Sequence, residues 1–101
     1  YVHCTEWKAS KLDPGGMAEV IRIPAGIVAR DCFAVNDLSA EQALFIEPLA
    51  CCVKAISQAP VAGLHVGVVG CGVMGLLNIE AAFAFGASRV TAIEPGEARR
   101  R

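Results

Sequence analysis

The chain has 101 residues, 54% of them hydrophobic, and a formal net charge of −1. This charge balance gives no electrostatic basis for binding nucleic acid or an anionic membrane surface, so we expect neither as a partner. The hydrophobic fraction is sufficient for a buried core. The chain starts at Tyr1 without a methionine, and residues 97–101 look like the opening turn of a helix. We therefore expect a fragment of a larger protein.

The first third of the sequence predicts short extended segments. A turn at Asp13–Gly16 is followed by Met17–Pro24, in which apolar and polar residues alternate, and we interpret that segment as a strand. Ile27–Val35 follows as a second, shorter extended region. Together they predict a β-rich part of the chain.

Two helices are predicted next. Ser39–Gln42 is a capping box, in which each of the two terminal side chains can bond the other residue's backbone N–H, and it predicts a short helix over Ala40–Phe45. A second helix is predicted over Pro48–Gln58, since proline is favoured in a first helical turn. The domain boundary is expected within Ala55–Gly63.

The cysteines indicate a reducing compartment. The five of them, at positions 4, 32, 51, 52 and 71, have no regular spacing, and an odd number does not suit a disulfide framework. We therefore expect a cytoplasmic protein, with Cys51 and Cys52 as small buried hydrophobic side chains.

The most specific pattern lies between positions 65 and 94. It consists of an apolar run, a glycine loop, an apolar helical segment, a second apolar run and an acid: His65–Val69, Gly70-Cys71-Gly72-Val73-Met74-Gly75, Leu76–Phe85, Arg89–Ile93 and Glu94. This is the G-x-G-x-x-G dinucleotide fingerprint with the strands, helix and acid that it requires. The sequence therefore predicts a βαβ unit that binds a dinucleotide.

Each loop position has a separate predicted role. Gly70 allows the sharp turn out of the strand, Gly72 lets the pyrophosphate approach the backbone, and Gly75 lets the helix pack against the strand. Val73 and Met74 precede the predicted helix, whose N-terminus offers free N–H groups and a partial positive charge to phosphates. We assign all five positions to cofactor binding.

Glu94 predicts the choice of cofactor. It follows Gly75 by 19 residues, where a carboxylate can accept hydrogen bonds from the adenosine ribose hydroxyls. The same carboxylate repels a 2′-phosphate, so we expect NAD to be preferred over NADP. The basic segment Arg99–Arg101 would favour NADP instead, because arginine is the usual partner of a 2′-phosphate.

Two other interpretations of this region remain open. A methyltransferase can use a similar strand, loop and acid for a nucleoside. The segment Ala55–Ile79 contains no charged residue and is long enough to span a bilayer, but its proline and glycines divide it into a linker, a strand, a loop and a helix.

Glu47 is an acid between apolar residues at a predicted helix start. It can complement the helix dipole, or it can face a metal. Local sequence leaves both roles open.

Five motifs in order carry a family resemblance: Asp13–Val20 (DPGGMAEV), Leu38–Ala43 (LSAEQA), Glu47–Cys51 (EPLAC), the glycine loop and Ile93–Pro95. The chain resembles the zinc-dependent medium-chain alcohol dehydrogenases, in the branch of the sorbitol and threonine dehydrogenases. The resemblance implies an α/β fold. It places the end of a GroES-like β-rich catalytic domain at residues 1–56 and the first βαβ unit of a Rossmann NAD-binding domain at residues 57–101.

The resemblance also implies roles for three further residues. Glu47 matches a position that faces or ligates the catalytic zinc, and Cys4 matches the last cysteine of a structural zinc lobe. Arg99 matches a basic position that contacts the adenosine ribose. The family's catalytic cysteine and His-Glu pair precede this segment, so we assign no catalytic residue and expect the fragment alone to be inactive.

The resemblance implies an oxidoreductase that transfers a hydride from a small alcohol or polyol to NAD with the help of zinc, as a homo-oligomer at full length. One alternative is a zinc-free medium-chain reductase of the quinone oxidoreductase type. A second alternative, from another class, is a nucleotide-binding module without catalysis.

Overall fold

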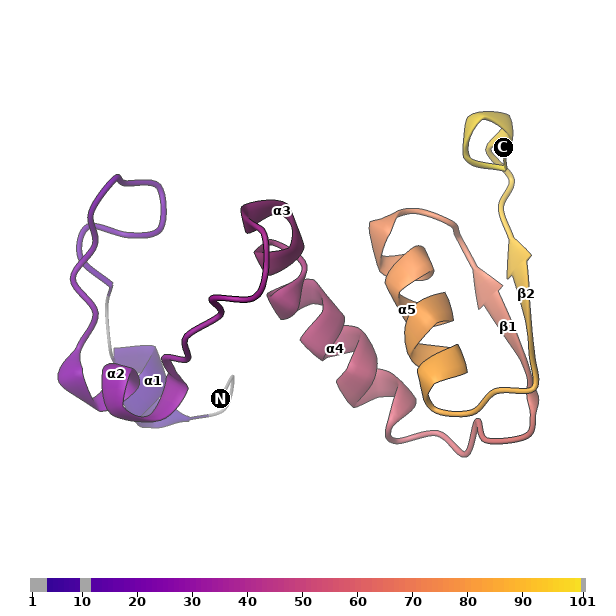
Figure 1. Ribbon diagram of the computed structural model, residues 1–101, viewed down its shortest axis with the longest axis horizontal. Helices are drawn as coiled ribbons and strands as arrows, with labels where there is room; N and C mark the ends of the chain where they lie inside the picture. The colour runs from indigo at the N-terminus through magenta and orange to yellow at the C-terminus, as the bar shows by residue number, and fades with distance from the viewer. Residues whose placement is uncertain (1–3, 10–11, 101) are drawn as a thin grey trace. The chain divides into compact units, whose positions relative to one another are not determined.

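The computed structural model describes residues 4–9 and 12–100, apart from the side chains of Glu6 and Trp7. It divides into two compact units, Tyr1–Asn36 and Asp37–Arg101, which we call the N-terminal and C-terminal units. The fold is a mixture of helices and strands with a small parallel sheet, so the α/β class is confirmed (Figure 1).

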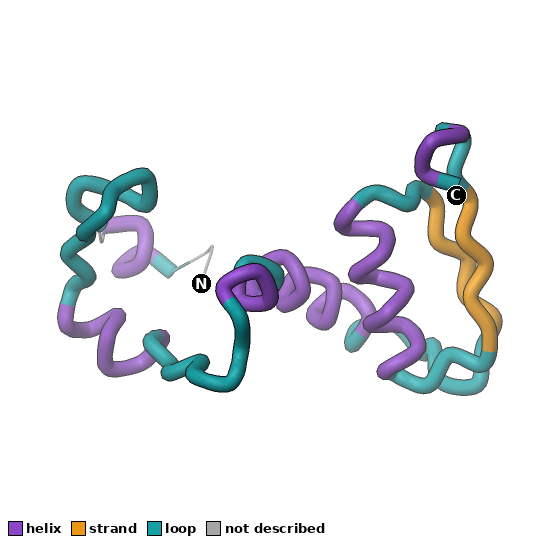
Figure 2. Tube along the Cα trace, turned by 45° about the horizontal axis from the view of Figure 1, so that its top comes forward, coloured by secondary structure: helices purple, strands orange, loops and turns teal. Residues whose placement is uncertain are grey.

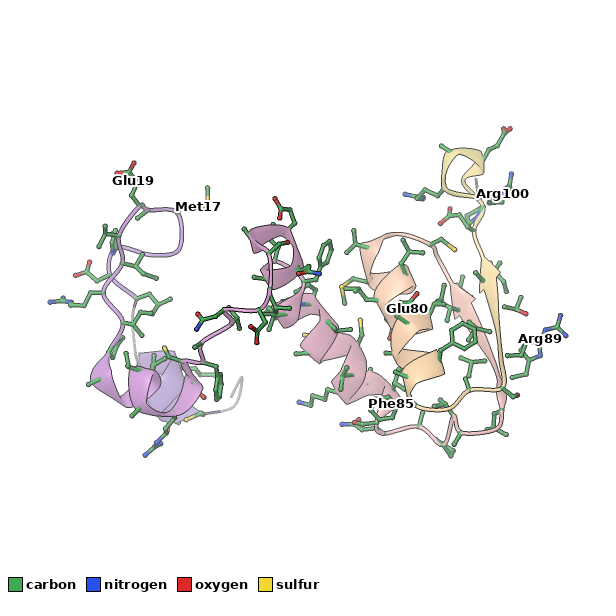
Figure 3. The ribbon with its side chains drawn as sticks, viewed as in Figure 1. Met17, Glu19, Glu80, Phe85, Arg89 and Arg100 are labelled. Atoms are coloured by element: carbon green, nitrogen blue, oxygen red, sulfur yellow. The ribbon has the colours of Figure 1, made fainter. Side chains whose placement is uncertain are left out.

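In the N-terminal unit, the described residues form two short helices, α1 (Thr5–Ala9) and α2 (Ala25–Asp31). The loop between them is closed at its base by Asp13 and Arg22, whose backbones exchange hydrogen bonds of 3.3 and 2.8 Å in an isolated antiparallel bridge. Figure 3 shows Met17 at the tip of this loop, where it is fully exposed.

Both extended segments predicted for this unit are wrong. Met17–Val20 forms bends, Arg22 is a single bridge residue, and the rest of Met17–Pro24 has no regular structure. The predicted extended region Ile27–Val35 begins inside α2. Alternation stabilises a strand only when a neighbouring strand pairs with it. Among the described residues, the bridge at Asp13 is the one such pairing offered to Met17–Pro24. The β-rich character predicted for residues 1–56 is therefore not confirmed.

The C-terminal unit begins with the two predicted helices. α3 (Ala40–Ala43) has the predicted capping box: Gln42 N donates to Ser39 Oγ at 3.2 Å, and Ser39 N donates to Gln42 Oε1 at 2.9 Å. α4 (Ile46–Ile56) begins two residues before the predicted start, and Pro48 lies in its first turn. A proline costs no hydrogen bond there, because the first N–H groups of a helix have no partner within it.

The predicted βαβ unit is confirmed. β1 (His65–Val69) pairs in parallel with β2 (Arg89–Ile93), and α5 (Val73–Ala84) connects them. Figures 1 and 2 show α5 beside the strands, and it also packs against α4. α5 begins three residues earlier than predicted, within the glycine loop, so that the last three residues of the loop, Val73–Gly75, form the start of the helix. A 3₁₀ turn, η1 (Glu97–Arg99), follows β2.

The buried apolar residues of the described chain all lie in the C-terminal unit: Cys52, Val61, Ala81, Ala82 and Ala87. Cys52 on α4 is 1% exposed, and its thiol lies 3.7 Å from the Met74 carbonyl of α5. This small, fully buried side chain therefore lies at the contact of α4 with α5. The prediction that Cys51 is also buried is wrong, since consecutive helical residues face different sides and Cys51 is exposed.

The uncharged segment Ala55–Ile79 divides as the sequence predicts. It contains the end of α4, a linker, β1, the glycine loop and the start of α5. Within residues 4–9 and 12–100, no helix combines the length and apolar character needed to cross a bilayer.

Candidate functional site

The glycine loop turns the chain from β1 into α5 in three residues. Gly70 has a φ of +96°, a conformation that side chains make unfavourable, and its N–H donates to the Ile93 carbonyl of β2 at 2.7 Å. The turn is therefore attached to both strands at the carboxyl end of the sheet, where α/β proteins bind ligands.

Gly75 allows α5 to approach this turn closely. A Cβ added at Gly75 would clash with the Gly70 carbonyl, at 2.8 Å from its carbon and closer still to its oxygen. The backbone of the helix thus lies against the backbone of the loop. This is the close packing that the fingerprint predicts for its third glycine.

Gly72 has the opposite surroundings. It is the N-cap of α5, and a Cβ added there would meet no atom of the described residues within 4 Å. No side chain caps the helix, and the first intrahelical bond is donated by Leu76 to the Gly72 carbonyl at 3.0 Å. The N–H groups of Val73 and Met74 precede that bond, and both residues are exposed. The space and the free donors fit an approaching pyrophosphate.

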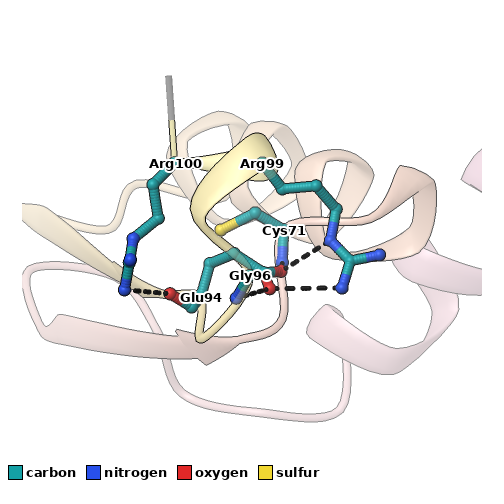
Figure 4. A network of polar contacts seen from close by, with 5 residues as sticks. All are labelled: Cys71, Glu94, Gly96, Arg99 and Arg100. Carbon is teal, nitrogen blue, oxygen red and sulfur yellow. Dashed lines mark hydrogen bonds and ion pairs between the residues drawn. The ribbon is translucent and has the colours of Figure 1, made fainter.

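Glu94 lies next to this loop, because the register pairs Val69 with Ile93 and so brings the next two residues together. Its side chain is 3% exposed. The Cys71 N–H donates to Oε2 and the Gly96 N–H donates to Oε1, each at 2.7 Å (Figure 4). Two main-chain donors therefore hold the carboxylate beside the glycine loop.

Two arginines complete the surroundings of Glu94. Arg99 Nη2 lies 3.3 Å from Oε1 and Nε lies 3.2 Å from Oε2, while Arg100 Nη1 donates to the main-chain carbonyl of Glu94 at 3.3 Å (Figure 4). The N–H groups of Cys71 and Gly96 hold the pKa of Glu94 below its ordinary value; burial opposes them, and Arg99 lowers the pKa further. The carboxylate is thus kept ionised.

Sequence reasoning missed the donors Cys71, Gly96 and Arg100. A signal for Cys71 was available, because parallel strands in register bring the residues that follow them together. The Gly96 contact arises from a turn just after β2, with its donor two residues beyond the carboxylate. The sequence gives no such signal for the side chain of Arg100.

The predicted metal residues are not brought together with further ligands. Glu47 is exposed in the first turn of α4, and Cys51 donates its thiol to Glu47 Oε1 at 3.6 Å. The negative charge of Glu47 raises the pKa of that thiol. Cys4 is exposed in the N-terminal unit. Across residues 4–9 and 12–100, no three His, Cys, Asp or Glu side chains are grouped so that they could hold a metal ion.

Known proteins similar to this chain were found among the threonine dehydrogenases. An L-threonine 3-dehydrogenase of Bacillus subtilis (strain 168) is 34% identical over 99 residues, which are 97% of this chain and 28% of that protein. The enzyme of the same name from Pyrococcus furiosus is 36% identical over 101 residues, 99% of this chain and 28% of that protein. The predicted family resemblance is confirmed. The chain is similar to a part of zinc medium-chain alcohol dehydrogenases.

A third relative, the L-threonine 3-dehydrogenase of Bacillus licheniformis, is 36% identical over 86 residues, 84% of this chain and 24% of that protein. The chain thus spans about a quarter of the length of the curated relatives it matches. No family model matches it. No solved structure matches it either.

Proposed function

We propose that the chain binds the adenosine half of NAD within a longer dehydrogenase. This proposal rests on two features that lie side by side. Gly72, at the N-terminus of α5, has free space around it, and Glu94 next to the loop carries an ionised carboxylate. The first offers N–H donors to a pyrophosphate, and the second offers acceptors to ribose hydroxyls. The similarity to threonine dehydrogenases supports the same cofactor class.

In this proposal the residues of the chain bind and orient the cofactor. The N–H groups of Val73 and Met74 hold the pyrophosphate, Gly72 leaves room for it, and Glu94 orients the adenosine ribose. NAD, once bound, supplies the hydride acceptor. The positioning provided here makes the transfer effectively intramolecular, and the reacting groups come from other parts of the enzyme.

We propose NAD rather than NADP as the cofactor. The Glu94 side chain is 3% exposed, so its charge is poorly screened, and a 2′-phosphate beside it is repelled. Arg99 opposes this effect, but its own charge is already paired with Glu94. We expect the ratio of kcat/KM for NAD over NADP to be at least about tenfold in the full-length protein, equivalent to ~1.4 kcal/mol.

For the substrate we propose a small alcohol or polyol. The named relatives act on L-threonine, so an alcohol that carries an amino group is a specific candidate. Zinc assistance, a homo-oligomeric full-length protein and a cytoplasmic location rest on the sequence interpretation and are proposed with it. The quinone-type reductase and the non-catalytic nucleotide module remain the alternatives.

The zinc proposal concerns Glu47 and Cys4. Neither has a set of further ligands among the described residues, so the test is metal content. Glu47→Ala in the full-length protein should lower bound zinc or turnover by about 10–100-fold and leave NAD binding intact. Glu80→Ala removes an exposed carboxylate of α5 and is the matched control. Unchanged zinc content and rate would leave Glu47 with the helix-dipole role.

The cofactor proposal is tested with Gly72→Val. No described atom lies within 4 Å of the added Cβ, and the φ of −73° suits any side chain, so the fold should persist. The branched side chain occupies the space where the pyrophosphate approaches, and we expect the dissociation constant for NAD to rise by at least tenfold, about 1.4 kcal/mol, by titration calorimetry. An unchanged dissociation constant in a folded variant would contradict the proposal.

A further inference from the structure

The first turn of α5 lacks the side-chain cap that commonly fixes a helix N-terminus. Its N-cap is Gly72 and it contains Gly75, so two of its positions have the backbone with the greatest conformational freedom. The N–H groups proposed to bind a pyrophosphate belong to this turn. Their direction therefore depends on the contacts that other residues make with it.

Two side chains reach the same backbone atom of this turn, the carbonyl oxygen of Met74. Asn78, a half-buried residue of the next turn of α5, donates to it from Nδ2 at 2.8 Å. The Cys52 thiol of α4 lies 3.7 Å from it. A thiol is a weak donor, so Asn78 makes the stronger of the two contacts. Asn78 therefore links the first turn of α5 to the turn that follows it.

The Met74 carbonyl and the Gly75 N–H are opposite ends of one peptide group, which is planar and rigid. The Gly75 N–H precedes the first intrahelical hydrogen bond, which Leu76 donates to Gly72. Like the two N–H groups before it, it has no acceptor within the helix. A hydrogen bond to one end of a peptide group fixes the direction of the other end and increases its polarity. A donor at the Met74 carbonyl therefore makes the Gly75 N–H a better oriented and stronger donor to an anion.

We propose that Asn78 is a positioning residue for the pyrophosphate: its side chain holds the Met74 carbonyl and so orients the Gly75 N–H toward the phosphates. This inference rests on the proposed function. The residue type supports it, since asparagine is a poorer helix former than alanine or leucine. Asn78 and Glu80 are the two polar side chains of α5, and Glu80 is exposed. The half-buried asparagine thus weakens the helix and strengthens the site at its N-terminus.

The difference between a ligand with phosphates and one without them tests this role. In the full-length protein, Asn78→Ala removes the donor and should weaken ADP binding by about two- to fourfold, the range expected when a hydrogen bond to a charged group loses its cooperative support. Adenosine carries the same ribose and base but no phosphate, so its dissociation constant should not change. Titration calorimetry measures both ligands. Alanine favours the helix, so the variant should fold.

Asn78→Ser is the rescue variant. A serine hydroxyl in a helix can donate to the carbonyl four residues earlier, so it should restore most of the affinity for ADP. Glu80→Ala is the matched control, because it also replaces a polar side chain of α5 with alanine. Loss of this exposed negative charge should not weaken the binding of ADP, which is itself an anion.

Four results would overturn the role of Asn78. Equal ADP affinity in Asn78→Ala and the wild type would show that the Met74 carbonyl needs no side-chain donor. Equal weakening of ADP and adenosine would assign the effect to the packing of α5 as a whole. Failure of Asn78→Ser to restore the affinity would assign it to the size of the side chain. These three results leave the proposed function standing, whereas failure of the wild-type protein to bind either ADP or NAD would overturn both.

Discussion

Different contacts stabilise each of the two units. In the C-terminal unit, α5 packs against both strands and α4, and every buried apolar residue of the described chain is there. In the N-terminal unit, α2 buries no residue, and one bridge between Asp13 and Arg22 closes the loop. Fully buried side chains thus stabilise the C-terminal unit, whereas the described side chains of the N-terminal unit are at most half-buried. Substitutions should separate these two sources of stability.

The largest expected effect is that of Gly75→Ala. The added Cβ overlaps the Gly70 carbonyl, so α5 must move away from the loop, and overpacking of this kind costs about 1–3 kcal/mol or more. The corresponding change in the N-terminal unit is Gly26→Ala in α2, where no described atom lies within 4 Å of the new Cβ. Alanine favours the helix, so we expect a gain of about 0.5 kcal/mol there.

Hydrogen–deuterium exchange of the full-length protein, followed by mass spectrometry, measures both changes. Gly75→Ala should accelerate exchange in peptides from α5 and β1, and Gly26→Ala should slow it in peptides from α2. Slower or unchanged exchange in the α5 peptides of Gly75→Ala would show that the helix does not depend on close packing at the loop.

The same contrast explains how much of the fold could be predicted. The elements of residues 65–93 were correct because their pattern, glycine loop and pairing partners lie in one continuous segment. The capping box at Ser39 was correct because it needs contacts only three residues apart. Met17–Pro24 was wrong because alternation alone does not provide a pairing strand. Local signals were sufficient where the partners were also local.

The candidate site was predictable to the same extent. The roles of Gly70 and Gly75 agree with the φ of the first and the close approach at the second. The position of Glu94 beside the loop follows from the register of the strands. The occupation of its carboxylate by Arg99 was not predictable, because it depends on the rotamer of a side chain that lies on a turn after the strand. The cofactor and metal roles remain predictions.

The next largest effect is the contribution of Glu94 to the pH dependence of the stability of the C-terminal unit. The pKa of Glu94 in the folded protein is below the ordinary value of 4.5, so its ionisation stabilises the folded state fully above that pH. As pH falls below 4.5, the unfolded chain binds the proton first, and the contribution is lost as pH passes through the lower folded pKa. Glu94→Gln should lower the denaturation midpoint at neutral pH and remove this part of the acid dependence.

Urea denaturation of the full-length protein measures how the midpoints of the wild type and Glu94→Gln differ. The measurement runs between about pH 3 and pH 7, a range that brackets the ordinary pKa of a glutamate. Glu80→Gln is the control. Glu80 is an exposed residue of α5 (Figure 3), so this substitution removes the same charge elsewhere in the unit. Parallel pH profiles for the wild type and Glu94→Gln would mean that the contacts of the carboxylate with Cys71 and Gly96 contribute nothing to stability.

A smaller effect is expected at the start of α3. Ser39→Ala removes the side-chain acceptor for the Gln42 N–H, and loss of an N-cap costs about 0.5–2 kcal/mol. Ser39→Asp keeps an acceptor at that position and should restore most of the difference. Exchange of the α3 amides in the full-length protein measures both variants. Equal protection in Ser39→Ala and the wild type would show that the side-chain cap does not stabilise α3.

The smallest effect is expected at the contact that closes the loop of the N-terminal unit. Arg22 Nη2 and Asp13 Oδ2 are 2.8 Å apart, but their side chains are 81% and 62% exposed. Exposed pairs contribute about 0.2–1 kcal/mol, and salt screens them. A double-mutant cycle with Asp13→Asn and Arg22→Gln should give a coupling in this range that declines as salt is raised. The two backbone hydrogen bonds of the bridge do not depend on the side-chain charges, so the loop should remain closed in the double variant. A coupling of several kcal/mol that resists salt would show instead that this pair is buried in the full-length protein, and that the N-terminal unit, like the C-terminal one, is stabilised by packing.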